Sequence, residues 1–170
     1  MKTFLKILVI ALFLSAGSLN AQKVLKIGNI NSQELFAIMP EKIEADKQLV
    51  VQNTTLVTQL ETMQVEFNKK YEEYLAQQDT LQALIRQTKE EDLNVLNQRI
   101  ATFRDTAQKD LETKEAELYN PIIEKARNAI KEVAVAENYD YVFDTGAGNV
   151  IHFPEGDNLL ELVKTKLGIQ

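Results

Sequence analysis

DYVFDTGAGNVIHF, residues 140–153, differs from the helix-forming sequence that precedes it. Residues 140–144 alternate polar side chains with β-branched or aromatic ones, 145–149 supply turn residues, and 150–153 resume the alternation. This pattern predicts a β-hairpin. Because an isolated hairpin is only marginally stable in water, we expect the β-like run at 23–30 to contribute a third strand.

The loop of this predicted hairpin has a second interpretation, in which Gly146 and Gly148 cradle a phosphate. It lacks the full glycine pattern, a following helix N-terminus and a suitably placed lysine, so turn chemistry is the better interpretation. His152 is the only histidine, which leaves nothing from which to build a metal cluster or a His-based nucleophile relay. We interpret it as a strand residue and expect no enzyme activity, catalytic residue, metal or cofactor.

The region between Asn29 and Thr145 contains no glycine and is rich in Glu, Lys, Gln, Leu and Ala, which favours helix. Apolar residues recur there at steps of three and four, in two runs that predict two antiparallel coiled-coil helices. The first seam comprises Leu49, Leu56, Leu60, Met63, Phe67, Tyr74, Leu81 and Leu84, and the second comprises Leu93, Leu96, Ile100, Phe103, Ala107, Leu111, Leu118, Ile122, Ala126, Ile130 and Val133.

The polar stretch Thr88–Asp92 lies midway between Pro40 and Tyr139, so we expect the chain to reverse there. Each helix of the hairpin would then hold roughly 45 to 50 residues and extend about 70 Å. Polar residues interrupt the seams, which predicts a weak and bendable coiled coil. Pro121 removes one helical hydrogen bond and should kink the descending helix.

Local signals mark the ends of the other helices. Asn31, with Glu34 three residues later, predicts the cap of a short helix that stops before Pro40, and Pro40 suits the first turn of the next helix. A last helix is expected over 158–167, capped by Asp157 or Asn158 with Glu161 and ending at Gly168.

The N-terminus has the order of a secretory signal peptide: Lys2 and Lys6, an apolar run at 7–14, then small and polar residues to Ala21. We expect cleavage after Ala21. The alternative, a retained anchor, is disfavoured because the run is shorter than the ~20 residues that span a bilayer. No other segment of the sequence is apolar enough to span one.

Removal of the signal peptide leaves 17 of the 19 basic residues against 25 acidic ones, a formal charge of −8. No basic cluster is present, which argues against a nucleic-acid partner. The absence of cysteine excludes disulfides and a lipid-modified cysteine at the cleavage site. Stability must come from packing and association.

These observations predict an α+β fold, in which a long antiparallel helical hairpin, residues 41–138, projects as an arm from a small β-sheet body. The body would comprise residues 22–40 and 139–170, after a signal peptide at 1–21. Exposed sheet edges need covering, so we expect the body to oligomerise. The residues expected to build it are Ile27, Ile30, Tyr141, Val142, Phe143, Val150 and Ile151.

Three segments carry a family resemblance: LKIGNINSQELF at 25–36, YNPIIEKARNAIKEVAVAENYDYVFD at 119–144 and NLLELVKTKLG at 158–168. They resemble the Skp (OmpH-like) family of periplasmic chaperones. The resemblance implies a homotrimer in which strands of three chains build a central body and three helical hairpins surround a cavity. It also implies that unfolded outer-membrane proteins are held there without ATP. The best-known members are basic with positive arm tips, whereas this chain is acidic, which makes membrane or lipopolysaccharide contact doubtful.

The cavity of such a chaperone should be lined by apolar side chains outside the seam of the arm. Candidates on heptad spacings are Val50, Val57 and Tyr71, then Val51 and Val65, with Leu75 nearby. The alternative is that these residues only widen the seam. A non-specific grip needs many weak contacts, so no single residue should dominate.

Two hypotheses describe the function, and the family resemblance implies the first of them. The first is an ATP-independent periplasmic holdase that binds unfolded outer-membrane or envelope proteins between its arms and prevents their aggregation. The second is a structural or adaptor protein of the cell envelope, a continuous coiled-coil rod with one fixed partner. A rod over 41–138 would be roughly 150 Å long, about twice the length of a folded-back arm.

Overall fold

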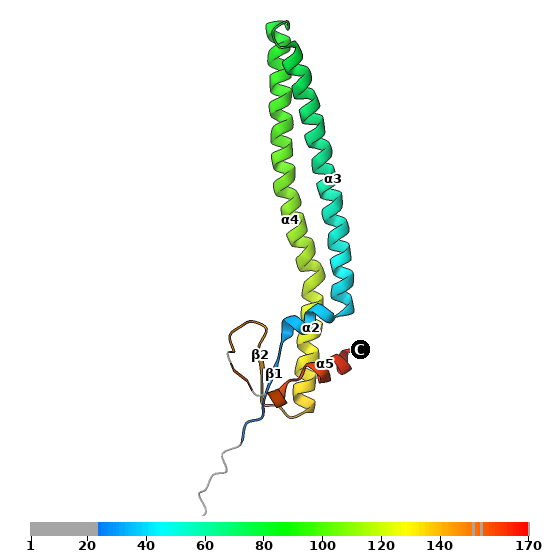
Figure 1. Cartoon of the computed structure of the whole chain (residues 1–170), viewed down its shortest axis with the longest axis vertical. Coiled ribbons are helices and arrows are strands. Elements are labelled where there is room, and N and C mark those ends of the chain that lie inside the picture. The colour runs from blue at the N-terminus through cyan, green and yellow to red at the C-terminus, as the bar shows by residue number, and fades with distance from the viewer. Residues whose placement is uncertain (1–23, 151, 154, 170) are drawn as a thin grey trace, which may run out of the picture.

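The computed structural model describes residues 24–150, 152–153 and 155–169. The predicted signal peptide lies outside the described residues, as does Ile151. Figure 1 shows a small body from which one long helical arm projects. No helix in this described part of the chain combines the length and the apolar character that crossing a bilayer requires.

The arm is an antiparallel pair of helices, α3 (Pro40–Gln77) and α4 (Ala83–Ala136), which lie side by side (Figure 1). Pro40 occupies the first turn of α3, as predicted. The short helix α2 (Ser32–Ile38) precedes it, and the Asn31 side chain accepts hydrogen bonds from the backbone N–H groups of Gln33 and Glu34. These contacts confirm the predicted Asn31 cap.

The reversal at the far end of the arm comes earlier in the chain than predicted. α3 ends at Gln77, and the Thr80 hydroxyl and backbone N–H both donate to its carbonyl. Thr88–Asp92 instead continues α4, and the Thr88 hydroxyl bonds to the Leu84 carbonyl. The prediction was wrong because it assumed helices of equal length: α4 has 54 residues against 38 in α3, since its last turns extend into the body.

The seam of the arm is thin. Its buried cluster consists of Met63, Leu96 and Ile100, with Leu60, Phe67 and Phe103 partly buried against it. Leu84, which was assigned to the first seam, lies in the first turn of α4 and is 75% exposed. α4 continues through Pro121 as one helix, and the kink expected there stays a prediction. The arm therefore buries little beyond one narrow line of contacts.

The predicted hairpin does not form. Strand β2 (Tyr141–Asp144) pairs in parallel with β1 (Ile27–Ile30), in a register that runs from Ile27 opposite Tyr141 to Ile30 opposite Asp144. Val150, His152 and Phe153 have no regular secondary structure. The prediction looked for a partner close in sequence, but the whole arm acts as the crossover that returns the chain in parallel.

The loop after β2 is a turn, as the glycines indicated. The Asp144 carboxylate accepts from the backbone N–H of Gly146, and Gly148 has a left-handed φ of 73°. The same carboxylate accepts from the backbone N–H and the hydroxyl of Ser32, at 3.1 and 2.5 Å. Asp144 therefore ties the end of β2 to the start of α2.

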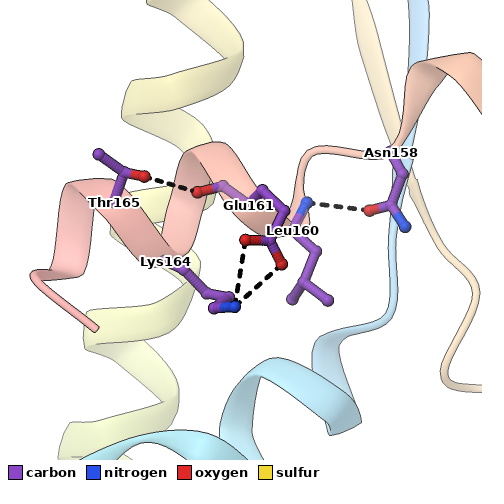
Figure 2. Close-up of polar contacts among 5 residues, drawn as sticks. All are labelled: Asn158, Leu160, Glu161, Lys164 and Thr165. Atoms are coloured by element: carbon purple, nitrogen blue, oxygen red, sulfur yellow. Dashed lines mark hydrogen bonds and ion pairs between the residues drawn. The ribbon is translucent and has the colours of Figure 1, made fainter. Parts of the chain in front are cut away.

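The last helix, α5 (Leu160–Leu167), follows a short 3₁₀ turn (Glu155–Asp157) and ends at Gly168 in the left-handed conformation, as predicted. The Asn158 side chain accepts from the Leu160 backbone N–H. Glu161 pairs with Lys164 instead of completing a capping box (Figure 2). At the other end, the Gly168 backbone N–H donates to the Thr165 carbonyl at 3.1 Å and closes the last turn.

α5 completes the core of the body. Leu159 and Val163 are fully buried with Ile30 of β1, Leu35 of α2 and Met39. The last turns of α4 add Ile122, Ala126, Ala129 and Val133, and Ala45 of α3 and Leu160 of α5 complete the cluster. The main core of the chain is thus assembled from its two sequence ends, with the root of the arm built into it.

Gly28 is the tightest point of this packing. A Cβ atom at Gly28 would lie 2.4 Å from Leu159 Cδ1 and 2.9 Å from the Tyr139 ring. We predict that Gly28→Ala lowers the free energy of unfolding by about 1–3 kcal/mol through overpacking, measured by urea denaturation. Gly156→Ala is the matched control, because a Cβ there meets nothing within 4 Å. Equal denaturation midpoints for both variants would contradict the packing described.

Candidate functional site

α3 carries a row of apolar side chains that its own seam does not use. All six residues proposed from the sequence lie there, between 45% and 67% exposed: Val50, Val51, Val57, Val65, Tyr71 and Leu75. We call these six residues the α3 face. None of them is buried within a single chain, and Val57, Tyr71 and Leu75 are about half covered by neighbouring side chains.

The upper part of the α3 face is anchored by an aromatic pair. The Tyr71 ring stacks on Phe67 with centroids 6.0 Å apart and an interplanar angle of 7°. Phe67 packs against the buried cluster of the seam, so its position is fixed from inside the arm. Tyr71 thus presents an exposed ring whose orientation is set by a partly buried neighbour.

A polar cluster at the root of the arm fixes the direction in which α3 leaves the body. The Tyr119 hydroxyl of α4 donates to Asp46 of α3 at 2.7 Å, and Lys42 donates to the same carboxylate at 2.6 Å. Tyr119 also meets Phe36 of α2 edge to face, with centroids 5.3 Å apart. Three helices are joined at this point, which positions the α3 face relative to the body.

Charge strengthens this root cluster. The hydrogen bonds from Lys42 and Tyr119 hold the pKa of Asp46 below its usual value, while the same carboxylate raises the pKa of Lys42 and of Tyr119. Nearby, Lys125 of α4 pairs with Glu41 and lowers the pKa of that carboxyl. The groups are partly solvated, so each contact contributes modestly to stability.

No local pattern in the sequence predicts the root cluster. Asp46 and Tyr119 are 73 residues apart, and each is an ordinary polar or aromatic residue within a helical pattern. Only the folding back of α4 along α3 brings them together.

The body presents a second exposed apolar surface on one side of the two-stranded sheet. Ile27, Tyr141 and Phe143 alternate with inward-facing residues and are 45–56% exposed. We call these three residues the outer sheet face. Beside it lies a cavity of about 550 Å³, lined also by Asn149, Val150, His152 and Phe153.

The other predicted body residues have different positions. Ile30 is buried in the chain's own core, and Val142 packs against that core. Val150 is half-buried at the cavity. Within residues 24–150, 152–153 and 155–169, no group of three or more His, Cys, Asp or Glu side chains could hold a metal ion. The two exposed apolar surfaces are therefore the candidate sites of this chain, one on the arm and one on the body.

Comparison with known proteins agrees with this architecture. The family model described as "Outer membrane protein (OmpH-like)" matches residues 26–167. The chain belongs to the OmpH-like family. The match spans both strands, the arm and α5, and it confirms the family resemblance found in the sequence.

Relatives of this OmpH-like chain include proteins named chaperone protein Skp. That of Pectobacterium atrosepticum is 26% identical over 132 residues, covering 78% of this chain and 80% of the relative. That of Photorhabdus laumondii is 28% identical over 144 residues, covering 85% of this chain and 86% of the relative. A crystal structure of an OmpH-like protein from Caulobacter crescentus has the same fold, with a TM-score of 0.74, 13% identity and 86% coverage of both chains.

The root cluster predicts a pH-dependent contribution to stability. The lowered pKa of Asp46 means that its ionised form stabilises the fold above about pH 4, the ordinary aspartate pKa, and that this is lost as pH falls through the lower folded value. Asp46→Asn should therefore unfold more easily than the wild type at neutral pH. The difference should shrink at about pH 3 and below.

Urea denaturation across this pH range measures the difference. Tyr119→Phe removes one of the two hydrogen bonds to Asp46 and should give a smaller loss at neutral pH. A deficit of Asp46→Asn that grows on acidification would contradict the assignment.

Proposed function

We propose that this chain is an ATP-independent periplasmic holdase, which binds unfolded outer-membrane or envelope proteins between its arms and prevents their aggregation. The observation that carries the proposal is the α3 face: a slender arm exposes six apolar side chains on a helix that does not need them for its own seam. Exposed apolar surface of this kind marks an interaction site. The likeness to chaperones named Skp and the OmpH-like fold support a chaperone role.

The composition of the α3 face suits reversible binding. Valine, tyrosine and leucine side chains on one helix offer many contacts of similar strength, at ~25 cal/mol per Å² of apolar area buried. A client held in this way can leave without input of chemical energy, because no single contact dominates. This is the physical basis for proposing independence from ATP.

The outer sheet face supports an oligomeric body. A two-stranded parallel sheet with one face in solvent is unusual, because parallel sheets are normally covered on both sides. Ile27, Tyr141 and Phe143 could be covered by the same residues of neighbouring chains. We propose a homotrimer, in line with the family resemblance, with residues 22–40 and 139–170 as its body and 41–138 as the arm.

The alternative function assumed a continuous rod, and the arm geometry contradicts that rod. α3 ends at Gln77 and α4 returns beside it from Ala83, so 41–138 is folded back on itself (Figure 1). The predicted signal peptide and the family likeness support a periplasmic location.

One prediction from the proposed function concerns the α3 face. Replacing Val50, Val57 and Val65 together by serine should weaken suppression of aggregation of an outer-membrane β-barrel protein diluted from denaturant, with at least about a tenfold loss of affinity from the lost apolar contacts. Light scattering at one trimer per client measures the effect. Val135→Ser is the matched control, because Val135 is 69% exposed but lies near the end of α4. Failure of the wild-type protein in excess to reduce aggregation would refute the proposal.

Another prediction concerns the assembly of the chain into a trimer. Light scattering of the mature protein should give three times the chain mass, and the double variant Tyr141→Ser, Phe143→Ser should shift it towards the monomer because it removes apolar area from the outer sheet face. Leu162→Ser is the control, since Leu162 is exposed on α5. A monomeric wild-type protein would contradict the proposed body.

A further inference from the structure

We call the part of the α3 face from Val50 to Val65 the lower α3 face. The charged residues in this stretch of α3 are all acidic. No basic residue lies between Gln48 and Asn68, and the only charged residues there are Glu61 and Glu66. Glu66 pairs with Lys70 at 3.0 Å. Glu61 comes four residues after Val57 and four before Val65, so it shares the side of the helix that carries these two valines.

The basic residue just before this stretch does not offset Glu61. Lys47 pairs with Glu44 at 3.3 Å. Across the seam, residues 93–112 of α4 carry three basic side chains, Arg99, Arg104 and Lys109, against three acidic ones, Asp105, Asp110 and Glu112. Lys69 follows Val65 by four residues on the same side of α3, so the negative charge of Glu61 is local to the stretch between Val57 and Val65, and the wider surroundings carry no surplus of either sign.

Threonines fill the gaps between the valines, and their hydroxyls are already bonded. Thr54 donates to the Val50 carbonyl at 2.8 Å and Thr58 to the Thr54 carbonyl at 2.9 Å. Thr55 and Thr62 make the same contact to the residue four positions earlier. A hydroxyl that donates to its own helix has no need of an outside acceptor, so these exposed threonines present their methyl groups as apolar surface.

We propose that the α3 face, extended by the methyl groups of Thr54 and Thr58, binds apolar segments of unfolded protein and prefers those flanked by basic residues to those flanked by acidic ones. This inference rests on the proposed chaperone function and specifies its client class. Glu61 attracts a basic flank and repels an acidic one. Because the site is open to water, the affinity for a segment with basic flanks should exceed that for a segment with acidic flanks by about two- to fivefold.

The charge preference is tested with three unstructured peptides that share one apolar core and carry lysine, serine or glutamate flanks. Fluorescence anisotropy with the full-length mature protein should give the tightest binding for lysine flanks and the weakest for glutamate flanks. Raising the salt from about 0.05 M to about 0.5 M should reduce the difference. Glu61→Gln should likewise reduce the difference in affinity between the lysine-flanked and glutamate-flanked peptides, whereas Glu112→Gln, the same charge change on α4, should preserve it.

The contribution of the methyl groups is tested by a pair of double variants. Thr54→Ser with Thr58→Ser keeps the hydroxyls and removes two methyl groups, and should weaken binding of all three peptides about two- to fourfold. Thr54→Val with Thr58→Val keeps the shape and removes the hydroxyls, and should bind at least as tightly as the wild type. Circular dichroism checks that both variants keep the helix content.

The possible failures are distinguishable. If the three peptides bind equally well and Glu61→Gln changes nothing, the charge preference is wrong while the chaperone proposal stands. If the double variant Thr54→Val, Thr58→Val binds the peptides more weakly than the wild type, the threonine hydroxyls bind clients and the apolar interpretation of the threonines is wrong. If no peptide binds and aggregation of the unfolded protein is also unaffected, the proposed function itself is refuted.

Discussion

Four parallel residue pairs, from Ile27 with Tyr141 to Ile30 with Asp144, hold the two ends of the chain together. A parallel pair cannot be closed by a tight turn and needs a long crossover. Here the crossover includes α2 and the whole arm, so pairing of the ends forces the middle of the chain to leave the body and return. The backbone N–H of Leu159 donates to the Asn29 carbonyl and adds the C-terminal segment to the same junction.

The arm and the body divide the stability of the chain unequally. The body core draws on β1, α2, α4 and α5, whereas the buried cluster within the arm contains only three residues. Such an arm depends on its root, where Asp46, Lys42 and Tyr119 join the helices to the body. Its thinness also explains its exposure, because two helices that share one narrow seam leave most of their surface to solvent. The proposed binding surface for unfolded chains therefore needs no preformed pocket.

The sequence predicted the features that depend on nearby residues. Asn31 as a cap, Pro40 as a helix start and Gly168 as a helix end each act within one turn of helix, and the structure has all three. The α3 face was also predictable, because heptad spacing separates side chains that meet the partner helix from those that do not. Its exposure within one chain is confirmed, while its role in binding stays a proposal.

The sequence failed where the partner lies far away along the chain. The run at 23–30 was rightly expected to join the sheet, but the hairpin prediction gave it the place of a third strand, whereas β1 is the direct partner of β2. The tip prediction placed the turn midway because no Gly or Pro marks Gln78–Gln82. The root cluster was missed for the same reason, since nothing local links Asp46 to Tyr119.

The central claim is that unfolded protein is held against the α3 face and not against the arm as a whole. A photo-crosslinking amino acid placed at Val57, and separately at Val135, tests this directly with an unfolded outer-membrane protein as client. The account predicts strong adducts from position 57 and few from position 135, although both side chains are well exposed. Equal adducts from the two positions, or adducts from position 135 alone, would contradict it.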